Sequence, residues 1–273
     1  MYNFTFIIEA LNNAFLPPFT GHIIRAAILK TISQENAALA GKLHEGNKIR
    51  PFSLSPIIPY KSRLHRTKRG EIKVQEGETF QFRLGILSSE LAQQLVTITL
   101  AKERLKFQLA KGQFKIVSIN IEQSTAEELL TPSTPLPKKM RFVFHTPTYL
   151  SILSQDFPLR FPDPRYIFTN LARLWNTFAP PTTQIDEEAF YNWLSEHVSI
   201  SGYDLTTRSA YISKGAPIIG FKGWVHYSLS EEKGDGAGYL QWVHALASFA
   251  EYSNIGGGRT AGFGCVSYEP KKE

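Results

Sequence analysis

The chain has 273 residues, of which 42% are hydrophobic and 20% are charged. This composition can build the core of one or two domains, and it excludes a globally disordered chain. Thirty basic residues against 24 acidic ones give a formal net charge of +6. Such an excess favours a polyanionic partner, either nucleic acid or an anionic membrane surface.

Cys265 is the only cysteine, which excludes an intramolecular disulfide and a cysteine-based metal site. The sequence contains no stretch near the roughly 20 apolar residues that span a bilayer. Its first residues, Met1 to Phe4, lack the basic region and apolar run of a secretory signal. We therefore expect a cytoplasmic protein without a membrane partner.

The first half of the chain alternates strand and helix patterns. Residues 2–10 are rich in Phe and Ile and predict a strand. Thr20 is the expected N-cap of a helix that carries an apolar stripe from Ile23 to Thr31. The other elements predicted here are a short helix at 35–43, an extended stretch at 50–59, a strand at 79–87, a helix at 90–100 and a strand at 114–121.

Three prolines between residues 131 and 139 indicate an extended linker, after which the pattern begins again. The elements predicted in the second half are a strand at 140–146, helices at 166–178 and 186–197, strands at 199–213 and 218–229, a helix at 239–252 and a strand at 261–269. The resulting order is that of the ferredoxin-like motif. We expect an α+β fold of two tandem ferredoxin-like domains, 1–131 and 140–273, joined by a linker at 132–139.

The segment from Asn254 to Gly264 contains five glycines between the last helix and the last strand. Glycines adopt positive φ and let backbone N–H groups approach a ligand closely, so this loop can hold phosphate oxygens. A helix C-cap followed by a turn explains one or two of the glycines as well. The residues expected to contact RNA here are Gly256, Gly257, Gly258, Arg259, Thr260, Gly262 and Gly264.

A second basic feature lies between residues 61 and 69, where five of nine side chains are cationic. Such a loop suits an RNA backbone, and a solvated loop is the plain alternative. The cations are Lys61, Arg63, Arg66, Lys68 and Arg69.

The glycine-rich run resembles the C-terminal signature of the repeat-associated RAMP proteins, in particular the endoribonucleases that process CRISPR precursor RNA. Asn254 stands where the signature has its first glycine, and Asn tolerates the left-handed region. Residues in both halves of the chain carry the resemblance. They are Pro18–Gly21 with Arg25, Leu43-His44-Glu45 followed by Pro51-Phe52-Ser53, Leu171–Trp175, Gly220–Tyr227, Ile255-Gly256, Arg259 and Gly262–Gly264.

The resemblance implies a metal-independent endoribonuclease that needs no cofactor and cuts CRISPR repeat RNA. An RNA 2′-hydroxyl would attack the adjacent phosphate, leaving a 2′,3′-cyclic phosphate and a 5′-hydroxyl. The resemblance places a catalytic histidine at His44 and a supporting cation at Lys48 or Arg50. Where the family often has a catalytic tyrosine, this chain has Leu29, which favours a site with two histidines.

Histidine suits both proton-transfer roles because its pKa lies near neutrality. His22 is predicted in the first turn of a helix, where the dipole lowers its pKa and attracts phosphate. Arg25 lies one turn further on the same face and can grip a phosphate. The plain alternatives are a surface histidine at a helix end for His44 and a solvated helix face for His22 and Arg25.

Two other functions stay open at this point. One is a non-catalytic RAMP subunit that binds guide RNA in a larger complex, and the histidines separate it from the nuclease. The other is a metabolic enzyme that binds a phosphorylated small molecule, which the basic loop and the high pI disfavour. Beyond CRISPR repeat RNA, other CRISPR effector subunits and a second copy of the chain are the partners considered.

Overall fold

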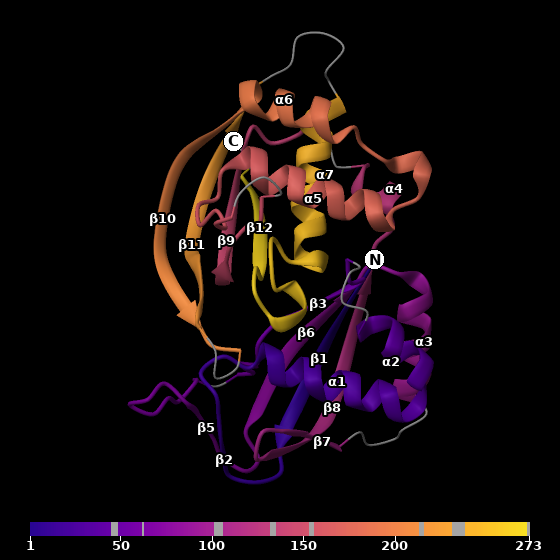
Figure 1. Ribbon diagram of the computed structural model, residues 1–273, viewed down its shortest axis with the longest axis vertical. Helices are drawn as coiled ribbons and strands as arrows, with labels where there is room; N and C mark the ends of the chain where they lie inside the picture. The colour runs from indigo at the N-terminus through magenta and orange to yellow at the C-terminus, as the bar shows by residue number, and fades with distance from the viewer. Residues whose placement is uncertain are drawn as a thin grey trace. The chain divides into compact units, whose positions relative to one another are not determined.

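The computed structural model describes residues 1–44, 49–61, 63–100, 106–131, 135–152, 156–212, 216–230 and 238–271. The chain forms two compact units, each with its own sheet and helices (Figure 1). The N-terminal unit comprises Met1–Gln123, Ala210–Ala216 and Thr260–Gly262. The C-terminal unit comprises Ser124–Ser209, Pro217–Arg259 and Phe263–Glu273.

The N-terminal unit is built on an antiparallel sheet whose central strand is β1 (Tyr2–Ala10). This strand pairs with β6 (Thr79–Ile86) on one side and with β8 (Gly112–Gln123) on the other. The outer strands are β3 (Phe52–Leu54) and β4 (Ile58–Pro59) beside β6, and β7 (Lys106–Leu109) beside β8. In chain order, β1, the β3–β4 segment, β6 and β8 fill the four strand positions of a ferredoxin-like domain.

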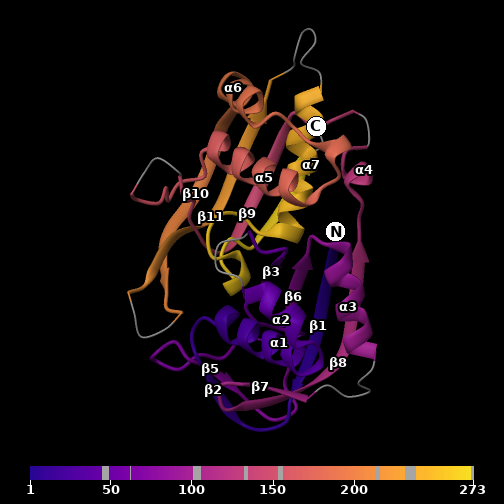
Figure 2. The same cartoon turned by 45° about the vertical axis from the view of Figure 1, so that its right-hand side comes forward.

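Helices α1 (Gly21–Glu35) and α3 (Ser89–Leu100) lie over one face of this sheet (Figure 2). Their apolar sides meet a phenylalanine-rich core in which the rings of Phe6 and Phe82 stack 4.9 Å apart. Burying each such side chain stabilises the fold by about 1.5–3 kcal/mol. The apolar stripe of α1 therefore fixes which of its faces turns outward.

Helix α1 begins after Thr20 as predicted, but the Thr20 side chain does not cap it. Its hydroxyl oxygen accepts a hydrogen bond from the Ile57 backbone N–H at 2.9 Å instead. After α1, Asn36 ends one helix and caps the next, because its side-chain oxygen accepts from the Leu39 N–H at 3.0 Å. The second helix is α2 (Ala37–His44), and a small sheet of β2 (Ala14–Leu16) and β5 (Ile72–Val74) completes the unit.

The C-terminal unit carries a four-stranded sheet in the order β10-β11-β9-β12, which is the ferredoxin-like order. Helices α5 and α7 lie side by side over one face of it (Figure 1). The Tyr227 hydroxyl is buried in this core and donates to the Pro162 carbonyl at 2.6 Å. The elements are α4 (Ala126–Leu129), β9 (Lys139–Thr148), α5 (Pro164–Phe178), α6 (Glu187–His197), β10 (Val198–Ala210), β11 (Ile218–Leu229), α7 (Gly238–Ser253) and β12 (Val266–Lys271).

The predicted α+β fold with tandem ferredoxin-like domains is confirmed, although the predicted start of the last strand is wrong. The last strand starts at Val266 and not at residue 261. Arg259–Ala261 form a single 3₁₀ turn, and Gly262 and Gly264 both adopt positive φ, so this stretch cannot continue a strand. Of the predicted linker, residues 132–134 lie outside the described ranges. Among the helices that are described, none is long and apolar enough to cross a membrane.

Candidate functional site

His22 lies in the first turn of α1, where the helix dipole attracts anions. Its Nδ1 atom is buried and has no hydrogen-bond partner in the described part of the chain. Burial, and then the positive charge of Arg25, lower the pKa of His22 below its usual value. His22 is therefore neutral at pH 7. Because Nδ1 is buried, a substrate could meet only the other ring nitrogen, Nε2.

Arg25 follows one turn later on α1 and is half-buried. One guanidinium nitrogen lies 3.5 Å from the hydroxyl of Thr260, to which it donates. Burial, and then the nearby charge of Arg50, lower the pKa of Arg25. Two arginines that repel each other beside a helix N-terminus form a place where a phosphate would be stabilised.

An open groove of about 510 Å³ runs along α1 from this cluster. His22, Arg25, Leu29 and Lys30 line it, and Ser33 and Gln34 line its far part. Leu29 is only 7% exposed and has no proton to transfer. Lys30 was not predicted as a site residue, although it lies eight residues after His22 and so shares its helix face.

His44 is the last residue of α2, the helix that packs beside α1. The His44 side chain and the whole of Lys48 lie outside the described residues. Arg50 is described, and its charge acts on Arg25. The roles expected of His44 and Lys48 therefore stay predictions.

The glycine-rich loop contributes three residues, Thr260–Gly262, to the N-terminal unit. They pack against the start of α1, where a Cβ on Gly21 would lie 2.0 Å from the Ala261 carbonyl oxygen. Gly262, at φ +90°, faces Gly21 and Pro56. This packing holds the Thr260 hydroxyl beside Arg25, so the loop shapes the cluster on α1.

Inside the C-terminal unit, the same loop packs on its own chain. A Cβ on Gly256 would lie 2.0 Å from the Tyr149 carbonyl oxygen, and one on Gly264 would lie 1.8 Å from the Ile255 carbonyl oxygen. Asn254 adopts φ 55°, in agreement with the tolerance expected of Asn. These positions need glycine or Asn for close packing, independently of any contact with RNA.

Arg259 is also engaged within the protein. Its guanidinium donates to the Ser253 carbonyl at 2.9 Å. The side chain keeps some exposure, yet its charged end is desolvated, and burial lowers the pKa of Arg259 to about 10. The backbone of Gly257 is engaged too, since its N–H donates to the Tyr149 carbonyl at 2.9 Å.

The five cations of the predicted basic loop differ in their surroundings, because within the described residues Arg66 alone among them is bonded to backbone carbonyls. Arg66 donates to the Gly70 carbonyl at 2.7 Å and to the Pro18 carbonyl at 3.1 Å, so it ties the loop to the segment before α1. The other four cations are all exposed, and they are Lys61, Arg63, Lys68 and Arg69.

Two histidines outside this region have structural partners. The His244 ring lies between the Tyr268 hydroxyl at 2.5 Å and the Pro137 carbonyl at 2.9 Å. The His197 ring stacks on Trp193 at 4.7 Å. Within the described ranges, no three His, Cys, Asp or Glu side chains gather as metal ligands would.

Comparisons with known proteins place the chain among CRISPR proteins. The family model "Cas6 N-terminal domain" matches residues 2–124, and the model "CRISPR-associated endoribonuclease Cas6" matches residues 142–266. A curated relative, CRISPR-associated endoribonuclease Cas6 of Streptococcus thermophilus, is 27% identical over 164 residues. That match spans 59% of this chain and 64% of the relative.

Solved structures match over nearly the whole chain. A Cas6 product complex has a TM-score of 0.73 at 20% identity and covers 98% of this chain and 100% of its own. A second Cas6 product complex has a TM-score of 0.74 at 20% identity and covers 97% and 99%. Thermus thermophilus Cas6 has a TM-score of 0.67 at 18% identity and covers 98% of each chain.

At these identities the solved structures support the fold, while the two family models identify the sequence in both halves. The RAMP resemblance predicted from the glycine-rich run and the Leu-His-Glu segment is thereby confirmed. The chain belongs to the family of the CRISPR-associated endoribonuclease Cas6.

Proposed function

We propose that this chain is an endoribonuclease that cuts CRISPR precursor RNA within its repeats, without a metal ion in the chemical step. The observation that carries this proposal is the cluster at the start of α1. A neutral histidine lies beside Arg25, and the charge of Arg50 acts on Arg25 in turn. Such a cluster offers a proton acceptor and positive charge for a phosphate.

In the proposed reaction, the 2′-hydroxyl oxygen forms a bond to the adjacent phosphorus, and the bond from phosphorus to the 5′-oxygen breaks. The proton of the 2′-hydroxyl passes to a base, and the 5′-oxygen takes a proton from an acid. The products carry a 2′,3′-cyclic phosphate and a 5′-hydroxyl. This exchange balances without an added water molecule, oxidant or metal.

His22 suits the base, because its lowered pKa leaves the ring unprotonated at pH 7. We assign the acid to His44, which ends the helix beside α1. Arg25 and Arg50 would stabilise the charge that builds on the phosphate, and Lys48 would assist. Lys61, Arg63, Lys68 and Arg69 would bind the RNA backbone away from the cut, while Thr260 and the glycines keep the cluster in shape.

The test is incubation of the purified protein with the repeat RNA of its own genome in EDTA. We expect one cut per repeat, a cyclic phosphate on the upstream product and a free 5′-hydroxyl on the downstream one. The matched control is the same RNA with a 2′-deoxy nucleotide before the cut, which should bind equally and stay intact.

Three outcomes would count against this proposal. Cutting that needs a divalent ion with prefolded RNA would contradict the metal-free step. Cutting of the deoxy RNA would contradict the nucleophile. Tight binding of intact repeat RNA without any cut would favour a non-catalytic RNA-binding subunit.

A further inference from the structure

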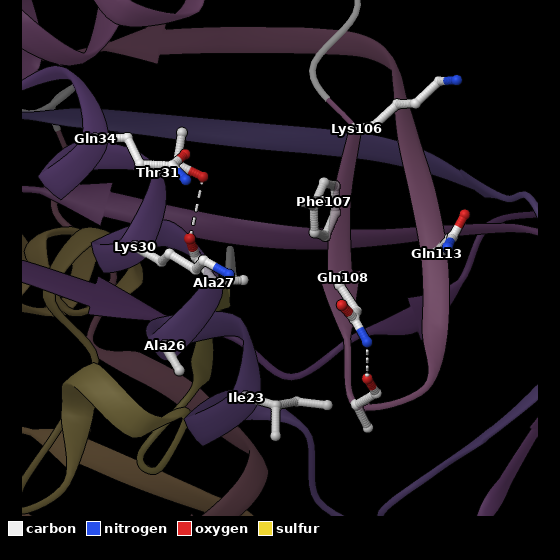
Figure 3. Close-up of a pocket in the computed structure, with 11 residues that line it drawn as sticks. Ile23, Ala26, Ala27, Lys30, Thr31, Gln34, Lys106, Phe107, Gln108 and Gln113 are labelled. Carbon is white, nitrogen blue, oxygen red and sulfur yellow. Dashed lines mark hydrogen bonds between the residues drawn. The ribbon is translucent and has the colours of Figure 1, made fainter.

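A second concavity lies on α1 next to the groove that starts at His22. It has a volume of about 490 Å³ and lies between α1 and the β7–β8 hairpin (Figure 3). Lys30 and Gln34 line it from α1, and Phe107, Gln108 and Gln113 line it from the hairpin. Lys30, Gln34 and Ala26 also line the groove that starts at His22, so the two hollows share a wall.

The lining has the chemistry of a nucleotide site. Phe107 is half-buried and offers an apolar ring. Aliphatic side chains and polar ones both lie around it; the amides and cations of the lining are Lys30, Gln34, Lys106, Gln108 and Gln113. Lys30 and Lys106 are exposed, and neither has an ion-pair partner among the described residues. An apolar ring, amide groups and unpaired cations match the base face, base edge and phosphate of RNA.

Gln108 is exposed and makes a hydrogen bond within the hairpin. Its amide nitrogen donates to the Ala110 carbonyl at 2.7 Å, and Figure 3 shows its amide oxygen on the side toward α1. The pocket therefore presents a hydrogen-bond acceptor. An N–H group on the edge of a base can donate to it, either an exocyclic amino group or the ring N–H of uracil.

The backbone that orients Gln108 is itself unusual. Ala110 opens the two-residue turn between β7 and β8 at φ 50°, a conformation in which glycine is the usual residue. The Ala110 carbonyl that results is the one that accepts from Gln108. The two-residue hairpin turn requires this positive φ, and the turn thereby places the carbonyl to which Gln108 donates.

We propose that this pocket holds one unpaired nucleotide of the substrate RNA, within a few nucleotides of the phosphate that is cut, because Lys30 lies about 12 Å along α1 from His22. The inference rests on the proposed function, because the shared wall of Lys30 and Gln34 leads from the pocket to His22. Lys30 would contact the phosphate between the two sites, and Gln108 would accept from the base.

The experiment combines single changes in the RNA with substitutions in the protein. The repeat RNA of the protein's own genome is made with a single abasic nucleotide at each position near the cut, and dissociation constants are measured. The wild type is compared with a Gln108→Leu, Lys30→Gln double variant and with Lys30→Gln alone. Lys111→Gln is the charge-matched control, since Lys111 is exposed on the same hairpin but does not line the pocket.

At one position near the cut, the abasic change should weaken wild-type binding about tenfold. In the double variant, the same change should weaken binding less than in the wild type, because the hydrogen bond from the base to Gln108 is gone and only stacking on Phe107 remains. The Lys111→Gln protein should keep the full tenfold effect.

Equal abasic effects in the wild type and the double variant at every position would overturn the pocket assignment. A wild type that cuts normally but shows this equality would leave the proposed function standing and remove only the pocket. A wild type that binds the repeat RNA without cutting it would sink the nuclease, while the binding comparison would still decide the pocket. Failure to bind repeat RNA at all would overturn both.

Discussion

Gly21 and Gly262 face each other although they lie 241 positions apart in the sequence; Gly21 has no room for a side chain, and Gly262 has little. A Cβ on Gly262 would lie 3.1 Å from the Gly21 Cα, and a Cβ on Gly21 would lie 2.0 Å from the Ala261 carbonyl oxygen. The second distance is far below any tolerated approach to backbone. The start of α1 and the segment Thr260–Gly262 therefore pack backbone against backbone, which glycine at both places permits.

Gly21→Ala should destabilise the protein by roughly 1–3 kcal/mol, because the new methyl group pushes against backbone that cannot rotate away. Urea denaturation measures this change. The control is Gly41→Ala on α2, where a Cβ meets nothing within 4 Å and where alanine favours the helix by roughly 0.5–1 kcal/mol. Equal stability of the two variants would show that the loop does not pack on α1 in this way.

His22→Ala and His44→Ala should each lower the single-turnover cleavage rate by about 10²-fold or more, while RNA affinity changes little. Both remove a proton-transfer group but no charge that binding needs at neutral pH. Because the two groups would serve one transition state, the double variant should lose less than the product of the single losses. His197→Gln, in the C-terminal unit, is the control. A His22→Ala protein that cuts at the wild-type rate would remove His22 from the mechanism.

The acid limb of the pH profile should lie below pH 6.5. A base must be unprotonated to work, and burial together with Arg25 lowers the pKa of His22. Cleavage should therefore stay active as the pH falls to 6.5 and decline only below it, when kcat/KM is measured for prefolded RNA. Arg25→Gln removes the neighbouring charge and should move this limb to higher pH. A limb above pH 7 in the wild type would contradict the assignment.

RNA binding should weaken with salt, and the four exposed cations of the basic loop should account for part of the slope. Changing Lys61, Arg63, Lys68 and Arg69 to Gln should flatten the plot of log K against log salt by about 0.7 for each phosphate that the loop no longer binds. Arg66→Gln should act differently, because Arg66 binds the Pro18 and Gly70 carbonyls. Its main effect should be on stability. An unchanged slope in the fourfold variant would show that the loop is solvated and does not bind the RNA backbone.

The C-terminal unit should lose stability as the pH falls through the pKa of His244. Burial lowers this pKa, and the hydrogen bond to Pro137 only partly opposes the effect. A lowered pKa means that the stabilisation is complete above the unfolded value of about 6.5 and is lost below it. His244→Gln, which cannot titrate there, should make urea stability between pH 7.5 and pH 5 less dependent on pH. Identical pH dependence of the two proteins would contradict this.

Local patterns predicted much of the fold. The apolar stripe of α1 and the Phe- and Ile-rich run of β1 were sufficient, because burial of apolar side chains decides both elements. The side-chain partner of Thr20 could not be predicted, since the competing N–H belongs to Ile57, far along the chain. The start of the last strand could not be predicted either, because the positive φ of Gly262 and Gly264 prevents a strand before Val266.

The candidate site divides in the same way. His22 and Arg25 could be found from a helix start followed by a basic residue one turn later. The proximity of Arg50 to Arg25, and of Thr260 to the same side chain, depends on tertiary packing. Arg66 was predicted by charge alone, and charge does not distinguish a phosphate ligand from a clamp on backbone carbonyls. No sequence pattern predicts the hydrogen bond that Gln108 donates to the Ala110 carbonyl.

The assignment of Thr260–Gly262 to the N-terminal unit also has a consequence for biosynthesis. The ribosome releases Met1–Gln123 long before it reaches residue 260, so a nascent chain can form the first sheet while the start of α1 still lacks its covering loop. Contacts this distant in sequence form late in folding. Chains truncated before Thr260 should therefore emerge with Arg25 unsupported, and a partly translated protein would carry an incomplete site.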